Sequence, residues 1–137
     1  MTGQTGVGLE LAQITLTESN CKNDLAGGIE VLAATASRIN IIHSAIARIQ
    51  QGTVDFDFGA AEMQIKYDGL AGDLMTWANA FLESATTRVD LRVPADKDST
   101  PSNTALIVYS DANAGTGTNG TIQIQVYYTQ ILADYAP

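Results

Sequence analysis

The chain has 137 residues, of which 45% are hydrophobic and 16% charged, and its formal net charge is −8. A chain of this length and apolar content is expected to fold as a single domain, spanning residues 1–137, rather than to remain disordered. Its pI is near 4.3 and its basic residues are spread singly, which argues against a nucleic-acid partner, and no apolar run approaches the roughly 18 residues of a membrane span.

The amino-terminal segment carries no export signal. It has no basic residue ahead of an apolar stretch and no small-residue cleavage site, so we expect no signal peptide. The single cysteine, Cys21, cannot form an internal disulfide, which fits synthesis in a reducing cytoplasm and equally fits a protein that is later exposed outside the cell.

The first half of the chain predicts one strand and one long helix. Apolar residues alternate with small or polar ones over 6–17, which is typical of a strand with one slip in phase. Over 29–51 the apolar residues step by three and four, which predicts an amphipathic helix with one apolar stripe. The stripe consists of Leu32, Ala36, Ile39, Ile42, Ile46 and Ile49.

A second helix is predicted over 60–84. Gly69 and Gly72 fall inside it and lower its helix propensity, but they permit a kink or a close backbone approach. The alternating segment 54–58 is interpreted as an extended connector, and the two helices as a hairpin with arms of roughly 25 residues. The apolar stripe of the second helix consists of Met63, Tyr67, Leu70, Leu74, Trp77 and Phe81.

The last third of the chain has the period of two that indicates strands. We expect strands over 88–93, 104–110 and 121–131, with the last two joined as a β-hairpin by a Gly- and Asn-rich tip. Together with the amino-terminal strand they predict an α+β fold, in which the long helical hairpin packs on an antiparallel sheet of about four strands.

Three motifs with chemical meaning favour structural interpretations. Residues 115–120 match G-x-G-x-x-G, but a strand follows where a dinucleotide site needs a helix, so we expect a flexible turn. Asp96 and Asp98 resemble the first half of a calcium loop without its central glycine and closing glutamate, so we expect a solvated loop, with adventitious Ca²⁺ as the alternative. Asp55 and Asp57 alternate with phenylalanines, which predicts acids in water and rings in the core.

The lone histidine and the lone cysteine do not predict a catalytic site. His43 falls on the apolar stripe of the first expected helix, where a hydrogen-bonded packing role is favoured over catalysis. Cys21 lies in a polar segment with only Lys22 near it in sequence to activate the thiol. One histidine and one cysteine cannot form a His/Cys zinc site, so we expect no metal, no cofactor and no enzymatic activity.

Some apolar positions exceed what a small core needs. Ile41 lies on a flank of the first expected helix, away from its stripe, and Tyr127 and Tyr128 give the last strand aromatic character on both faces. A sheet covered on both faces indicates burial against another subunit, whereas the alternative is an ordinary, well-stocked core. Ile41, Tyr127 and Tyr128 are therefore the candidate interface.

The carboxy-terminal pattern resembles a known class of proteins. Thr104-Ala-Leu-Ile-Val-Tyr109, a Gly/Asn/Thr-rich tip and Gly120-Thr-Ile-Gln-Ile-Gln-Val-Tyr-Tyr128 resemble the closing hairpin of small virion structural proteins of tailed bacteriophages. The resemblance implies a non-enzymatic structural or assembly protein, such as a capsid decoration or a tail or connector component. It further implies assembly in the host cytoplasm, a place in the virion, and association with other virion proteins and with itself as a homo-oligomer.

Two other functions remain open from the sequence alone. One is a small-molecule or peptide-binding module with a pocket between helices and sheet, near Phe56, Phe58 and Trp77. The other is an enzyme whose carboxylates converge only in the folded chain, where a shared site would raise their pKa values.

Overall fold

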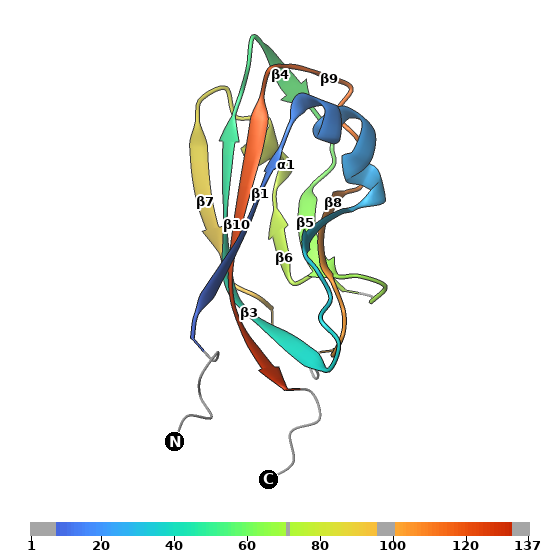
Figure 1. The fold of residues 1–137 in the computed structure, drawn as a ribbon. Helices are drawn as coiled ribbons and strands as arrows, with labels where there is room; N and C mark the ends of the chain where they lie inside the picture. Colours follow the sequence, from blue (N-terminus) through green and yellow to red (C-terminus); the bar gives the residue numbers. More distant parts are fainter. Residues whose placement is uncertain (1–7, 71, 96–100, 133–137) are drawn as a thin grey trace.

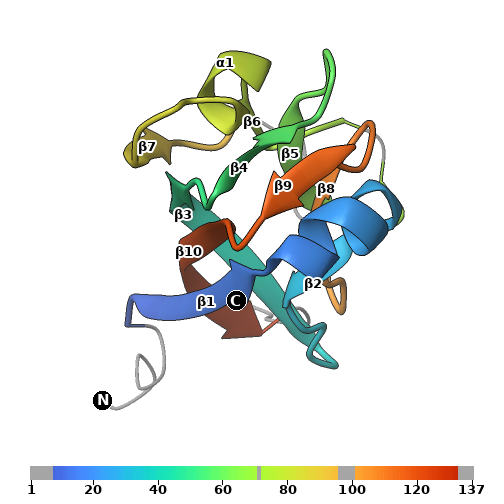
Figure 2. The same cartoon turned by 90° about the horizontal axis from the view of Figure 1, so that it is seen from above.

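Strands make up most of the folded chain and form two four-stranded antiparallel sheets (Figures 1 and 2). The structure is a computed structural model and describes residues 8–70, 72–95 and 101–132. Sheet A consists, in spatial order, of β1 (Glu10–Leu16), β10 (Thr121–Leu132), β3 (Arg38–Gln50) and β7 (Arg88–Arg92). Sheet B consists of β2 (Ile29–Leu32), β8 (Leu106–Ser110), β5 (Met63–Tyr67) and β6 (Met75–Trp77). A small third sheet pairs β4 (Val54–Asp57) with β9 (Thr116–Thr118).

Helical structure in the described residues is confined to short segments. A π-helical turn, η1 (Asn20–Asp24), and a 3-10 turn, η2 (Leu25–Gly27), connect β1 to β2, and α1 (Asn79–Leu82) follows β6. No helix within the described ranges is long and apolar enough to cross a membrane.

The strand order defines the architecture. All strand pairs within sheets A and B are antiparallel, and the chain crosses between the two layers after each strand except at the β5–β6 hairpin and around the short strands β4 and β9. The orders β1-β10-β3-β7 and β2-β8-β5-β6 are those of a double-sheet jelly roll. Figure 1 shows the two sheets as separate layers.

The core lies between the sheets because each strand alternates side chains toward and away from the other layer. On β10, Ile122, Ile124 and Val126 are fully buried while the residues between them are half-buried. Sheet B contributes Met63, Ile65, Trp77, Leu106 and Val108, all fully buried.

The predicted helix over 29–51 is wrong, because β2, a loop and the long strand β3 occupy this segment. The helical spacing arises from a β-bulge: the register of β3 against β10 shifts at His43, which is the extra residue. Ile42 and Ile49 are buried, whereas Ile46 is half-buried on the opposite side of the strand. The apparent stripe therefore mixes residues from both faces of a bulged strand.

The predicted helix over 60–84 is also wrong. Strand β5, a loop, β6 and the four-residue helix α1 occupy this segment. Gly69 and Gly72 adopt φ angles of 79° and 88°, in the left-handed region that favours glycine, and they turn the chain between β5 and β6. The described residues contain no helical hairpin, so the α+β class is wrong and the fold is all-β.

The strands expected in the last third have a different connection from the one predicted. Strands β7, β8 and β10 lie within or across the expected ranges, and β1 lies within 6–17, whose first two residues fall outside the described chain. The expected hairpin of β8 and β10 is wrong, because β8 belongs to sheet B whereas β10 lies between β1 and β3 in sheet A. The segment between them adds β9, which pairs with β4.

Packing explains two glycines of the segment 115–120. A Cβ atom added at Gly117 would overlap the ring of Phe56, and one added at Gly120 would lie 2.6 Å from that ring. Gly117 also has a φ of 142°, which side chains rarely adopt. The glycines therefore let backbone cover a buried aromatic ring at one end of the sandwich.

Candidate interaction surface

We term the side of sheet A that faces away from sheet B its outer face. The buried residues of β10 and β3 point toward sheet B, so the residues between them point outward. Cross-strand register extends this assignment to both edge strands, because Leu11 pairs with Tyr127 and Leu91 pairs with Ile46. The large apolar and aromatic side chains of the outer face are Leu9, Leu11, Ile39, Ile41, Ile46, Val89, Leu91, Val93, Tyr127 and Ile131.

Exposure on the outer face is concentrated at its two edges. Leu9 and Leu11 at the β1 edge, and Val89, Leu91 and Val93 at the β7 edge, are each between 50% and 68% exposed. These five are the majority of the large apolar side chains that the described chain exposes. Covering such side chains with a partner gains about 25 cal/mol per Å² of apolar area, before the cost of docking.

Strand β7 has the reverse polarity of the central strands of sheet A. Its inner side carries Arg88, Asp90 and Arg92, which lie opposite buried positions of β3. Arg92 Nη2 and Asp90 Oδ2 form an ion pair at 2.7 Å, and Trp77 Nε1 donates a hydrogen bond to the backbone oxygen of Asp90 at 3.4 Å. The charged side chains of β7 therefore point inward at the edge of the sandwich, and its apolar side chains, Val89 and Leu91, point outward.

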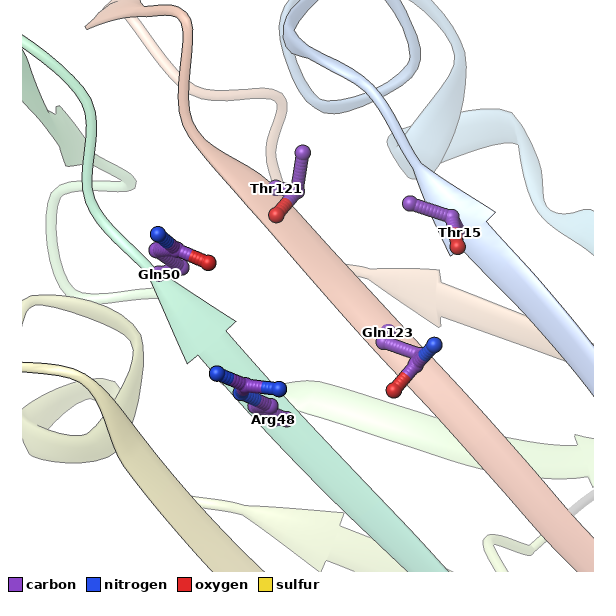
Figure 3. A pocket seen from close by; sticks show the side chains of 5 residues that line it. All are labelled: Thr15, Arg48, Gln50, Thr121 and Gln123. Carbon is purple, nitrogen blue, oxygen red and sulfur yellow. The ribbon is translucent and has the colours of Figure 1, made fainter.

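A shallow polar hollow lies on the same outer face, across β1, β10 and β3 (Figure 3). Its volume is about 110 Å³ and it is lined by Thr15, Arg48, Gln50, Thr121 and Gln123. Beside it, Gln125 Nε2 donates a hydrogen bond to Gln13 Oε1 at 2.8 Å. The outer face is thus divided into a polar half and an apolar half.

The structure brings two of the three predicted interface residues to this face. Ile41 is half-buried on β3, opposite Thr129, and Tyr127 is half-buried on β10. Tyr128 points the other way and packs against the core. Burial, with a smaller contribution from the carboxylate of Glu10, raises the pKa of the Tyr128 phenol, which agrees with its place on the inner side.

The residues of the alternative pocket fill the core instead. Phe56, Phe58 and Trp77 are at most 2% exposed, and the two phenyl rings pack at 5.8 Å between centroids. The helices that would have walled the expected pocket are strands and loops. These side chains therefore stabilise the sandwich, and the hollow on the outer face of sheet A has a different, polar lining.

The titratable and nucleophilic residues form no catalytic constellation in the described chain. Cys21 is fully buried, and burial raises the pKa of its thiol to about 12, which keeps it protonated at neutral pH. His43 is exposed at the bulge of β3, and its Nε2 lies 3.0 Å from Thr129 Oγ1. No group of three or more His, Cys, Asp or Glu residues that could hold a metal occurs in the described ranges. The candidate calcium pair Asp96 and Asp98 lies outside them.

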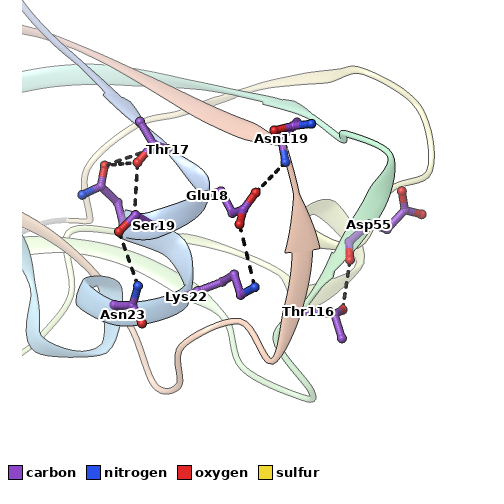
Figure 4. Close-up of polar contacts among 9 residues, drawn as sticks. Thr17, Glu18, Ser19, Lys22, Asn23, Asp55, Thr116 and Asn119 are labelled. Atoms are coloured by element: carbon purple, nitrogen blue, oxygen red, sulfur yellow. Dashed lines mark hydrogen bonds and ion pairs between the residues drawn. The ribbon is translucent and has the colours of Figure 1, made fainter.

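The glycine-rich segment 115–120 is tied to its neighbours by side-chain hydrogen bonds (Figure 4). The backbone N–H of Asn119 donates to Glu18 Oε1 at 2.8 Å, and Thr116 Oγ1 donates to the backbone oxygen of Asp55 at 3.0 Å. Lys22 Nζ lies 3.9 Å from the other oxygen of Glu18. The Glu18 carboxylate therefore already accepts the hydrogen bond of the Asn119 N–H, whereas a phosphate-binding loop would need that N–H to bind its phosphate.

No family model matches the sequence, and no curated protein matches it. Two solved phage capsids contain chains with this fold. A chain of the capsid asymmetric unit of cyanophage Pam1 matches with a TM-score of 0.59 at 15% identity, over 91% of this chain and 86% of that one. A chain of the acid-stable capsid of Helicobacter pylori bacteriophage KHP30 matches with a TM-score of 0.53 at 15% identity, over 93% and 94%. This likeness of fold agrees with the resemblance to phage virion structural proteins drawn from the sequence.

Proposed function

We propose that this chain is a structural component of a bacteriophage capsid, a decoration protein that attaches to other virion proteins through the outer face of sheet A. The observation that carries the proposal is the likeness to chains of two phage capsids over more than nine-tenths of this chain. Each match covers a nearly equal share of this chain and of the capsid chain. The likeness therefore concerns whole chains of similar length rather than one domain of a larger capsid chain.

The outer face supports binding to protein rather than to a small molecule. Its exposed leucine and valine side chains lie along its two edges, and the hollow on it has a polar lining. Ile41 and Tyr127 lie between the two exposed edges, so a partner that covers both edges also covers them.

The experiment is to purify the particles released by cells that carry the gene and to identify their proteins by mass spectrometry. We expect the chain in the particles, in a constant ratio to the main shell protein. A particle preparation that lacks the chain, from cells that do express it, would overturn the proposal.

Variants locate the attachment surface in the same experiment. Tyr127→Asp places a charge in the middle of the outer face, and Thr76→Asp places one on the opposite side of the molecule, on sheet B. We expect the first variant to be folded but missing from particles and the second to be incorporated. Incorporation of both variants would contradict attachment through the outer face.

A further inference from the structure

The two edges of sheet A are both open and run in opposite directions. Within the described residues, no strand pairs with the free side of β1 or of β7. The sheet has four strands and every neighbouring pair is antiparallel, so β1 and β7 are antiparallel to each other. A second copy placed beside the first in the same orientation therefore brings its β1 antiparallel to the first copy's β7.

Charge distinguishes the two edges. All four arginines of the chain lie on β3 and β7, and the inner side of β7 carries two of them, Arg88 and Arg92. The inner side of β1 carries Glu10, as its pairing with the core-packed Tyr128 shows. Outside sheet A, the described residues hold ten acids and two lysines. With two arginines and one aspartate, Asp90, the inner side of β7 is thus net basic on an acidic molecule.

We propose that β7 of one copy pairs with β1 of a second copy, so that sheet A continues from subunit to subunit. This inference names the partner within the proposed function and rests on it for its biological setting. The occupant of the β7 edge is a second copy because the complementary charge and the complementary apolar residues both lie on β1 of this same chain.

One register satisfies the charged and the apolar residues together. If Glu10 lies opposite Arg92, an antiparallel pair places Leu11 opposite Leu91 and Leu9 opposite Val93. Glu10 and Arg92 then share the inner side, while the leucines and Val93 share the outer side. Cross-strand pairs of these kinds each stabilise a sheet by roughly 0.2–1 kcal/mol.

The inward charges of β7 favour a partner strand that supplies opposite charge on its inner side. Charged side chains that point inward on an edge strand discourage unspecific pairing, because a neighbouring strand must supply the opposite charge. Two antiparallel β7 strands bring Arg88 opposite Arg92 in the register centred on Asp90, and an arginine opposite Asp90 in the registers on either side, whereas β7 with β1 brings Arg92 to Glu10. A nucleic acid is a poorer match, since Arg48 points outward while Arg88 and Arg92 point inward, which leaves no single cationic face. Such a head-to-tail contact closes into a ring or continues as a filament.

The test is disulfide formation between cysteines introduced at positions 11 and 91, as Leu11→Cys and Leu91→Cys in one chain. Directly opposed strand residues lie within the Cα separation that a disulfide spans. The native Cys21 is fully buried and does not compete. Mild oxidation of the double variant, alone at high concentration and within particles, is followed on non-reducing gels, with each single variant as the control.

We expect a ladder of covalent oligomers from the double variant and monomers from each single variant. Covalent dimers from Leu11→Cys alone or from Leu91→Cys alone would instead indicate pairing of like edges and overturn the proposal. The absence of a ladder both in solution and in particles would also overturn it. A ladder without incorporation into particles contradicts only the capsid function, and incorporation without a ladder contradicts only the strand pairing.

A charge exchange gives independent evidence. Glu10→Arg alone and Arg92→Glu alone should each weaken association, measured by light scattering coupled to size exclusion, and the double variant should restore it. The expected loss is a few-fold to tenfold in the association constant for each single variant. Equal association of all four proteins would overturn the predicted register.

Discussion

The outer faces of the two sheets differ in how their side chains are satisfied. On sheet B, Lys66 Nζ lies 4.7 Å from the centre of the Tyr109 ring, and Tyr109 donates a hydrogen bond to Asp73. Gln64, which pairs with Tyr109, is only 5% exposed. None of the exposed large apolar side chains in the described chain belongs to a strand of sheet B. Contacts within the subunit therefore engage Lys66, Tyr109 and Asp73 on sheet B, and they bury Gln64, whose Oε1 has no hydrogen-bond partner among the described residues.

The outer face of sheet A instead leaves large apolar side chains exposed. Leu11, Val89 and Leu91 are between 50% and 61% exposed. In the isolated subunit the exposed apolar area of these residues remains in contact with water, because they do not contribute to the core. This difference indicates that the outer face of sheet B is suited to contact with water, whereas the outer face of sheet A is suited to binding another protein.

The largest expected effect is a difference in the free energy of unfolding between a core substitution and a substitution on the outer face of sheet A. Trp77→Ala removes a fully buried side chain that packs between the sheets, so it should lower the free energy of unfolding by about 3–5 kcal/mol. Leu91→Ser, on the outer face, should change it by about 0.5 kcal/mol or less. Urea denaturation of both variants measures the contrast, and a large loss from Leu91→Ser would show that this face is already packed within the subunit.

A charge introduced on the outer face of sheet A should weaken association of the subunits, whereas a charge introduced on sheet B should not. Leu91→Asp removes a leucine from the proposed contact and adds a charge there, which should cost at least about 1.5 kcal/mol of association, or roughly tenfold. Thr76→Asp, on sheet B, should leave association unchanged. Light scattering of both variants tests this, and equal losses would remove the distinction between the faces.

Salt should weaken the contact of sheet A only in part. The pairing of Glu10 with Arg92 is screened as ionic strength rises, because the Debye length falls from about 10 Å at 0.1 M to about 3 Å at 1 M. The burial of Leu11 and Leu91 remains. We expect a few-fold loss of association, measured by sedimentation velocity. A contact abolished by salt would indicate that charge alone holds it.

The smallest effect concerns the outer face of sheet B at high pH. Burial, and then the hydrogen bond and charge of Asp73, raise the pKa of Tyr109 to about 12, above its ordinary value of 10. The folded state therefore holds this proton more tightly than the unfolded state, and Tyr109 should make stability fall as pH rises from 10 to 12. Thermal melts should show a shallower fall for Tyr109→Phe than for the unsubstituted protein. Equal slopes would indicate that the contact with Asp73 is not made.

The period-two segments of the sequence correctly predicted strands. The segments 29–51 and 60–84 were wrongly predicted as helices, because the structure has mostly strands there. The bulge at His43 changes the spacing of buried residues in β3, and this spacing imitates a helix. The density of isoleucine in 39–49 was the available signal, because β-branched residues favour strands. Gly69 and Gly72 were a second signal, since two glycines so close together are typical of a turn.

The candidate surface could be predicted only in part. Ile41 and Tyr127 were singled out and do lie on one face, although the reason given for Ile41 was its place on a helix that does not exist. The edges were missed because the alternation over 88–93 predicts a strand without indicating which of its sides faces the core. The outward direction of Val89 and Leu91 depends on the register of β7 against β3, which pairs residues 39 to 47 positions apart. No local pattern contains that information.

The most direct measurement is amide hydrogen exchange of the subunit, free and in its assembled form. The unpaired edge amides of β1 and β7 should exchange fast in the free subunit and become protected on assembly. The edge strands of sheet B, β2 and β6, should exchange alike in both states. Protection of β2 or β6 with no change in β1 and β7 would contradict the assignment of sheet A as the face that binds protein.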